Sequence, residues 1–145
     1  MENSNGMTAN FLVAKSTVKG TIENAWDCFV NPDHVVNWNF AGDDWHCPKS
    51  EATVETGGRF CHTMAAKDGS FSFDFFGNYT AVEPLQALRI VLGDGRKMEV
   101  DFKDLGDGKV EVIEQFEPEN QNPLELQQQG WQMILNRYAE YASQL

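Results

Sequence analysis

The end of the sequence constrains the fold most, because it predicts one long amphipathic helix. Asn122-Pro123-Leu124-Glu125 has the residues of a helix start, with Asn as the N-cap, Pro at the first helical position and Glu at the third. A helix of about 22 residues from this start is about 33 Å long at 1.5 Å per residue. An apolar stripe of this length, rich in Trp and Tyr, requires a broad sheet to cover it. The stripe consists of Trp131, Ile134, Leu135, Tyr138, Tyr141, Ala142 and Leu145.

The sequence before this helix predicts that sheet. Alternating or β-rich segments indicate strands over 11–18, 59–65, 71–82, 88–92, 98–102 and 110–116. Two short helices are expected after the first strand, the first capped by Thr21 and the second by Asn31. Asp68-Gly69 and Asp94-Gly95 are tight turns, and short links of this kind join antiparallel strands. The expected fold class is therefore α+β, with a mostly antiparallel sheet.

Composition excludes several classes of function. At 145 residues the chain predicts a flexible tail over 1–10 and a single domain over 11–145. A net charge of −11 without a basic patch argues against nucleic acid as a partner. No apolar stretch approaches the roughly 18 residues of a membrane span, so membrane insertion is not expected. Three cysteines without an export signal predict reduced thiols and a cytoplasmic location. We expect a monomer.

Strand parity predicts which side chains face the helix, and many of them are bulky and aromatic. A thin two-layer core cannot pack all of them at normal density. Either they fill the interior completely, or they line a cavity between sheet and helix, and the sequence leaves both alternatives open. The predicted inward set is Phe60, His62, Met64, Phe73, Phe75, Tyr79, Met98, Val100, Phe102, Val110, Val112, Glu114 and Phe116.

His62 and Glu114 are the two ionisable members of this inward set. A buried His–carboxylate pair would serve as a general base with its orienting partner, or would fix a ligand hydroxyl. The simpler alternative is that one of the two lies at a solvated pocket mouth. His62 also adjoins Cys61, as His46 adjoins Cys47, but adjacent residues in a strand point to opposite faces. We therefore expect no metal ion and no covalent cofactor.

The ordered motifs of the chain resemble the START-like superfamily, and more narrowly its bacterial branch related to the activator of the heat-shock-protein-90 ATPase. The resemblance covers residues 11–141. It implies a helix-grip fold, in which a curved antiparallel sheet wraps the C-terminal helix and leaves a pocket beneath it. The motifs are Trp38, Asp44-Trp45, Gly57-Gly58-Arg59-Phe60, Met64, Asp68-Gly69, Gly77-x-Tyr79, Asp94-Gly95-Arg96, Phe116-Glu117-x-Glu119 and Gly130-Trp131-x-x-Ile134-Leu135.

In that fold Trp38 and Trp45 border the cavity entrance, where they either gate a ligand or plug the end of the core. Superfamily members include lipid and hormone carriers, polyketide cyclases, self-sacrificing resistance proteins and chaperone co-activators, so the fold alone does not set the function. We expect non-enzymatic binding of a small, largely apolar molecule. The alternatives are a chaperone-interacting protein and, third, a cyclase or hydrolase that uses His62 and Glu114.

The expected ligand-binding residues come from the inward strand faces, the long helix and the entrance. They are Trp38, Trp45, Phe60, His62, Met64, Phe73, Phe75, Tyr79, Met98, Phe102, Glu114, Phe116, Trp131, Leu135 and Tyr138.

Overall fold

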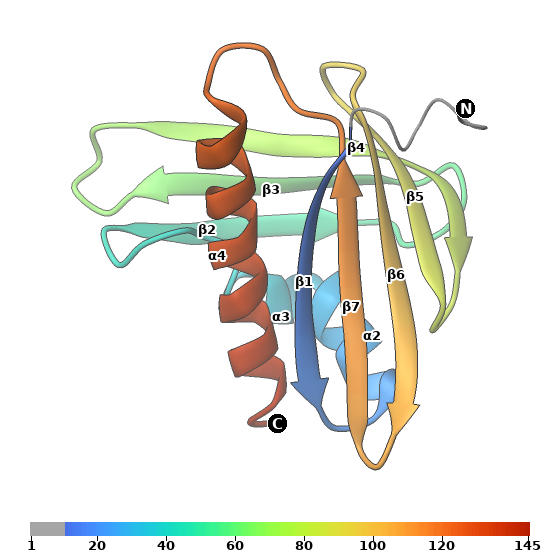
Figure 1. Cartoon of the computed structure of the whole chain (residues 1–145). Coiled ribbons are helices and arrows are strands. Elements are labelled where there is room, and N and C mark those ends of the chain that lie inside the picture. Colours follow the sequence, from blue (N-terminus) through green and yellow to red (C-terminus); the bar gives the residue numbers. More distant parts are fainter. Residues whose placement is uncertain (1–10) are drawn as a thin grey trace.

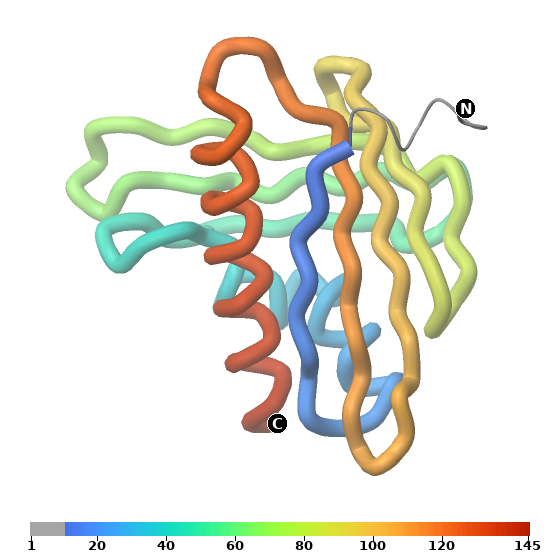
Figure 2. The backbone as a smooth tube through the Cα atoms, in the orientation of Figure 1, coloured from blue at the N-terminus to red at the C-terminus, as the bar shows by residue number. Residues whose placement is uncertain are grey.

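A computed structural model describes residues 11–145 as a curled sheet, a long C-terminal helix and two short helices (Figures 1 and 2). The expected tail over 1–10 lies outside the described residues. In chain order the elements are β1 (Leu12–Lys19), α2 (Ile22–Val30), α3 (Pro32–Val35), β2 (Trp45–Ala52), β3 (Arg59–Ala66), β4 (Ser72–Glu83), β5 (Ala87–Leu92), β6 (Lys97–Gly106), β7 (Lys109–Phe116) and α4 (Leu124–Ala142).

All neighbouring strands in the sheet are antiparallel, in the order β1-β7-β6-β5-β4-β3-β2. In Figure 1 the sheet curls, so that β2, β3 and β4 run across the direction of β1, β7 and β6. A register shift between Tyr79 and Ala81 interrupts the β4–β5 pairing, and such a bulge increases bending and twist. These features confirm the expected antiparallel sheet and its helix-grip architecture.

The long helix begins later than the sequence predicts. Its N-cap is Pro123, and no side chain caps it. The expected cap, Asn122, instead uses its side chain to donate to Glu119 at 3.0 Å. Gln127 stabilises the preceding loop: its amide nitrogen donates to the Asn122 carbonyl at 2.7 Å and to the Glu119 carbonyl at 3.0 Å, and its amide oxygen accepts from the Glu119 N–H at 2.9 Å. The prediction of an Asn122 cap was therefore wrong, because the Asn122 side chain bonds to Glu119 instead. Gln127, one turn into the helix, stabilises the loop that precedes it.

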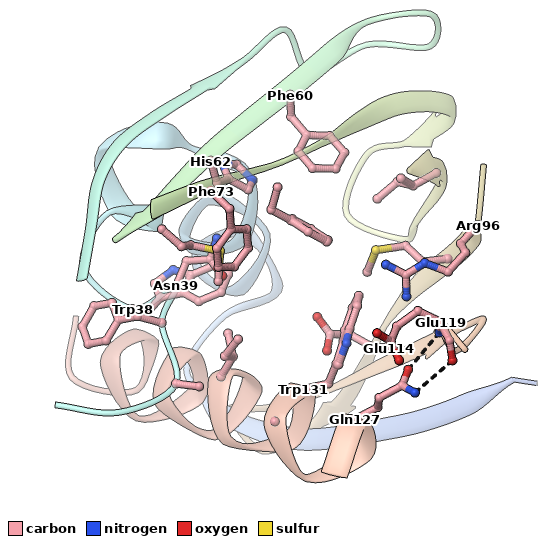
Figure 3. Close-up of a pocket in the computed structure, with 18 of the residues that line it drawn as sticks. Trp38, Asn39, Phe60, His62, Phe73, Arg96, Glu114, Glu119, Gln127 and Trp131 are labelled. Atoms are coloured by element: carbon pink, nitrogen blue, oxygen red, sulfur yellow. Dashed lines mark hydrogen bonds between the residues drawn. The ribbon is translucent and has the colours of Figure 1, made fainter. Parts of the chain in front are cut away.

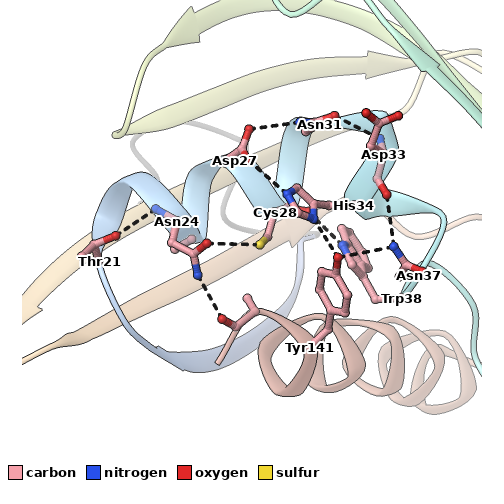
Figure 4. A network of polar contacts seen from close by, with 12 residues as sticks. Thr21, Asn24, Asp27, Cys28, Asn31, Asp33, His34, Asn37, Trp38 and Tyr141 are labelled. Atoms are coloured by element: carbon pink, nitrogen blue, oxygen red, sulfur yellow. Dashed lines mark hydrogen bonds and ion pairs between the residues drawn. The ribbon is translucent and has the colours of Figure 1, made fainter. Parts of the chain in front are cut away.

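The two short helices are capped as predicted and are tied to α4 (Figure 4). The Thr21 hydroxyl accepts from the Asn24 N–H at 3.1 Å, and the Asn31 side chain accepts from the Asp33 N–H at 3.0 Å. His34 Nδ1 lies 2.7 Å from the Tyr141 hydroxyl on α4. Asn24 also donates to the carbonyl of Ala142 at 3.0 Å. These polar contacts hold α2 and α3 against the C-terminal half of α4.

The hydrophobic core lies where α2 and this half of α4 meet β1, β7 and β6. Tyr138 is completely buried at this junction, and its hydroxyl donates to the Ala25 carbonyl on α2 at 2.6 Å. The aromatic side chain of Phe29 on α2 packs edge to face against both Tyr138 and Phe102. Because this part of the interior is filled, the space that remains lies beneath the other half of α4.

Candidate functional site: a cavity beneath the C-terminal helix

A cavity of about 450 Å³ lies between the concave face of the sheet and the N-terminal half of α4 (Figure 3). Pockets of about 300–1,000 Å³ with mostly apolar walls and a few polar groups are typical small-molecule sites. The sequence left a filled interior and an open cavity as equal alternatives, and the structure has both, in different places. The core is solid beneath the C-terminal half of α4 and hollow beneath its N-terminal half.

Most of the predicted binding residues line this cavity, and four do not. Phe102, Phe116, Leu135 and Tyr138 face the same interior but lie in the solid core. They share strand or helix parity with the lining residues. Phe102 is covered by Trp26 and Phe29 of α2, whereas Phe116 is covered by the indole ring of Trp131. Whether the lining residues contact a ligand stays a prediction. The predicted residues on the cavity wall are Trp38, Trp45, Phe60, His62, Met64, Phe73, Phe75, Tyr79, Met98, Glu114 and Trp131.

The floor of the cavity is an aromatic cluster centred on Phe60 of β3. The ring of Phe60 lies 5.0 Å from His62, 5.9 Å from Phe75 and 5.3 Å from Tyr79, measured between centroids. Gly77 is paired with Phe60 across the β3–β4 ladder. A Cβ at Gly77 would lie 2.7 Å from the Val91 carbonyl oxygen of β5 and 3.2 Å from the Phe60 ring, so a side chain there would clash with the neighbouring strand and crowd the ring. The glycine thus leaves room for Phe60 in the cluster.

The two tryptophans of the entrance region have different positions. Trp38 is 4% exposed, and its indole N–H donates to the Cys28 carbonyl at 2.9 Å, so it closes the end of the core. Trp45 is only partly buried and packs edge to face on Phe73, with centroids 6.0 Å apart. Phe73 is 42% exposed and Leu126 on α4 is 59% exposed, although both line the cavity. The opening therefore lies between the β3–β4 hairpin and the start of α4.

His62 is neutral in this site. Its Nδ1 lies 2.8 Å from the Ser50 hydroxyl on β2. Burial lowers the pKa of His62 to about 4, because the interior disfavours the imidazolium ion. The side chain can therefore present a neutral hydrogen-bonding nitrogen to the cavity, but it carries no charge at neutral pH.

Glu114 on β7 is also neutral at pH 7, because burial disfavours its charged form as well. For a carboxyl group this raises the pKa instead of lowering it. The residue is 6% exposed, and burial raises the pKa of its carboxyl group to about 8. Across the part of the chain that the structure describes, no hydrogen bond or ion pair joins Glu114 to His62, and Figure 3 places them on opposite sides of the cavity. The predicted His–carboxylate pair is therefore not formed, since β4, β5 and β6 separate their strands in the sheet.

The cavity has further polar lining residues that strand parity does not reveal, because they lie in turns and loops. Arg96 follows the β5–β6 turn, and its Nε donates to Asp94 at 2.7 Å. Glu119 follows β7, and hydrogen bonds from the Asn122 backbone N–H, and secondarily from Gln121, lower the pKa of its carboxyl group. Glu119 is a partly exposed loop residue, and strand parity gives no indication that it lines the cavity. The Asp94-Gly95-Arg96 motif was the signal that could have indicated Arg96.

Two kinds of site are not found among residues 11–145. No three His, Cys, Asp or Glu side chains lie close enough together to hold a metal ion. No helix in this range has the length and apolar character needed to cross a membrane.

A curled antiparallel sheet that closes a cavity with its C-terminal helix defines a START-like helix-grip protein. The family model of the activator of Hsp90 ATPase homolog 1-like proteins matches residues 19–143, and the chain belongs to this family.

Solved structures agree with this assignment. An AHSA1-like protein from Aeromonas hydrophila is 39% identical with a TM-score of 0.86, and the alignment covers 92% of each chain. A protein from Cytophaga hutchinsonii is 40% identical with a TM-score of 0.80, over 94% of each chain. A Nitrosomonas europaea protein shares the fold at 14% identity, with a TM-score of 0.77 over 93% of this chain and 95% of that one. A comparison with curated protein sequences gave no significant match.

Proposed function

We propose that the protein binds a small, largely apolar molecule in the cavity beneath α4. The observation that carries this proposal is the cavity itself, about 450 Å³ of space walled by aromatic and aliphatic side chains. A cavity of this size lacks the packing contacts that a solid core would have, and an apolar ligand would restore them. Its opening between Phe73 and Leu126 gives such a ligand a route of entry.

The test is a thermal-shift and Trp-fluorescence screen with sterols, flavonoids and fatty acids. A ligand at one hundred times its Kd stabilises the folded state by about 2.7 kcal/mol, which raises Tm measurably. The variant that tests whether the ligand binds in the cavity is Gly130→Leu on α4. A Cβ at Gly130 meets no atom within 4 Å, so the new side chain can enter the cavity without a backbone clash.

The control variant is Met133→Leu, because Met133 is on the same helix, 52% exposed and outside the cavity wall. We expect ligands that stabilise the wild type to stabilise Met133→Leu equally and Gly130→Leu much less. Equal binding to Gly130→Leu would place the ligand elsewhere and contradict the proposal, as would a screen in which nothing binds.

A second candidate is contact with an Hsp90-type chaperone, as the description of the family suggests. The supporting observation is the exposed aromatic tip of the β3–β4 hairpin, where Phe71 is 59% and Phe73 is 42% exposed. Exposed apolar patches of this kind often mark protein contacts. The test is the ATPase rate of an Hsp90-type chaperone with wild type and with Phe71→Ser. Stimulation that the variant loses would support this function, and no stimulation by the wild type would exclude it.

A further inference from the structure

Glu114 is the most unusual polar group on the cavity wall. It stands in the middle of β7, between Ala14 of β1 and Val100 of β6 in the register of the sheet. Among residues 11–145 its carboxyl group has no hydrogen-bond or ion-pair partner, although the residue is only 6% exposed. Gln127, the other buried polar residue on this side, makes three hydrogen bonds through its side chain.

A buried carboxyl group without a partner is destabilising, whereas buried polar groups in folded proteins are nearly always hydrogen-bonded. Replacement by an apolar residue would remove the cost, so its presence at the cavity wall points to a partner inside the cavity. Because β1 and β6 present only Ala14 and Val100 beside it, that partner comes from neither neighbouring strand. The carboxyl group instead faces the cavity, close to Trp131 (Figure 3).

The buried ionisable groups on α2 and α4 near Glu114 carry no positive charge that would favour ionisation of its carboxyl group. Burial raises the pKa of Cys28 on α2 to about 11. Burial, and secondarily the charges of Cys28 and Glu114, raise the pKa of Tyr138 on α4. Both groups are therefore neutral below pH 9 and offer Glu114 no positive charge.

The ionisable groups on the cavity wall favour a neutral ligand. Arg96 and Glu119 carry opposite charges on the same side as Glu114 (Figure 3). Burial keeps His62 neutral and raises the pKa of Tyr79 to about 12. A charged ligand would lose its hydration here, and neither sign of charge gains an unopposed partner.

We propose that Glu114 anchors the ligand, and that the ligand is a neutral amphipathic molecule whose carbonyl oxygen accepts a hydrogen bond from the Glu114 carboxyl group. This inference rests on the proposed ligand-binding function. A protonated carboxyl group is a strong donor, and a carbonyl oxygen is an acceptor that cannot remove the proton. The apolar body of the molecule then lies against Trp131, whose opposite face is covered by Phe116 at a centroid distance of 3.9 Å.

The test compares two naphthalenes that differ by one carbonyl group. The first is the fluorescent ketone 6-propionyl-2-(dimethylamino)naphthalene, and the second is the same molecule with a propyl group in place of the propionyl group. At pH 6.5 we expect Glu114→Leu to bind the ketone about tenfold more weakly than wild type, the effect of one lost hydrogen bond. Glu114→Leu should bind the propyl compound at least as tightly as wild type. Glu114→Gln keeps an N–H donor and should retain ketone binding within about threefold.

The pH dependence gives a second measurement that does not rely on the leucine variant folding. As the pH rises from 6.5 to 9, ketone affinity of the wild type should fall about tenfold because Glu114 loses its proton. The affinity of Glu114→Gln should stay constant over the same range, since an amide does not titrate.

The outcomes separate this inference from the proposed function. Suppose that both compounds bind the wild type, but ketone affinity is unchanged in Glu114→Leu or independent of pH. The proposed role of Glu114 as the anchor is then wrong, while the proposed ligand-binding function is still supported. Tighter binding at pH 6.5 of an analogue with an aminomethyl group in place of the propionyl group would overturn the neutral ligand class. If neither compound binds, and the screen of sterols, flavonoids and fatty acids also fails, the inference and the proposed function fall together.

Discussion

The indole ring of Trp131 lies almost parallel to the ring of Phe116, with centroids 3.9 Å apart and planes inclined by 10°. One face of the indole is thereby covered by β7, and Trp131 also lines the cavity. The same pair therefore connects the core to the binding site. Phe116 is completely buried, so the stability of the fold and the shape of the cavity wall both depend on it.

Replacing Phe116 with alanine should destabilise the protein strongly. Loss of a fully buried aromatic side chain typically lowers the free energy of unfolding by about 3–5 kcal/mol. Urea unfolding measures the change. The control is Leu105→Ala, because Leu105 is 54% exposed and should change stability by no more than about 0.5 kcal/mol. A loss below about 1 kcal/mol for Phe116→Ala would show that the stack does not contribute to the core.

Gly130→Ala should stabilise the protein. Gly130 lies in the interior of α4, where glycine costs about 0.5–1 kcal/mol relative to alanine. Its Cβ would meet no atom within 4 Å, so no clash offsets the gain. The measurement is the midpoint of thermal unfolding, and a lower midpoint would mean that this turn of α4 departs from helical geometry.

Tyr138→Phe should destabilise the junction of α2 and α4. It removes the hydrogen bond that the Tyr138 hydroxyl donates to the Ala25 carbonyl, and the loss of one such buried hydrogen bond costs about 0.5–1.5 kcal/mol. Tyr141→Phe is the matched control, because the Tyr141 hydroxyl is only partly buried and solvent can replace its contact with His34. Equal losses in chemical denaturation of the two variants would contradict this assignment.

Stability should depend on pH through Glu114 and His62, with opposite signs. Glu114 has a folded pKa of about 8 against an ordinary 4.5, so the folded state binds a proton more tightly than the unfolded state. The contribution of Glu114 to the free energy of unfolding therefore falls as the pH rises from 4.5 to 8. His62 has a folded pKa of about 4 against an ordinary 6.5, so its contribution falls as the pH drops from 6.5 to 4. Each slope reaches at most about 1.4 kcal/mol per pH unit.

The two contributions oppose each other between pH 4.5 and 6.5, and Glu114 alone acts between pH 6.5 and 8. Urea unfolding at a series of pH values should therefore show that Glu114→Gln removes a loss of stability above pH 6.5. His62→Gln should instead remove a loss below pH 6.5. If Glu114→Gln and wild type have parallel pH profiles, the carboxyl group is solvated and the description of the site is wrong.

The strands with clear alternation and Asp-Gly turns were predictable from sequence, and β2 was not. Pro48, Lys49, Ser50 and Glu51 give Trp45–Ala52 the composition of a loop. The segment forms an edge strand, where proline and charged residues are tolerated because one side of the strand needs no partner. The sequence missed β2 because its pairing with β3, rather than its own composition, makes it a strand.

Part of the cavity wall was also predictable. Parity identifies the face of a strand but not the position along it, so Phe102 was grouped with Phe60 although α2 covers only the first of them. Residues in turns and loops have no parity, and Asn39 and Glu119 were missed for this reason. The resemblance supplied what periodicity could not, namely that the sheet curls around the helix.

The strand order has a consequence for how the chain is made. β1 pairs with β7 along its whole length, from Leu12 opposite Phe116 to Lys19 opposite Lys109. During synthesis the first strand therefore emerges from the ribosome long before its partner does, and pairings between distant segments form slowly. Glu114 and Trp131 lie on β7 and α4, which emerge after the other strands of this fold. A nascent chain that lacks these two elements consequently has no enclosed cavity, and a ligand can bind there only after both have been synthesised.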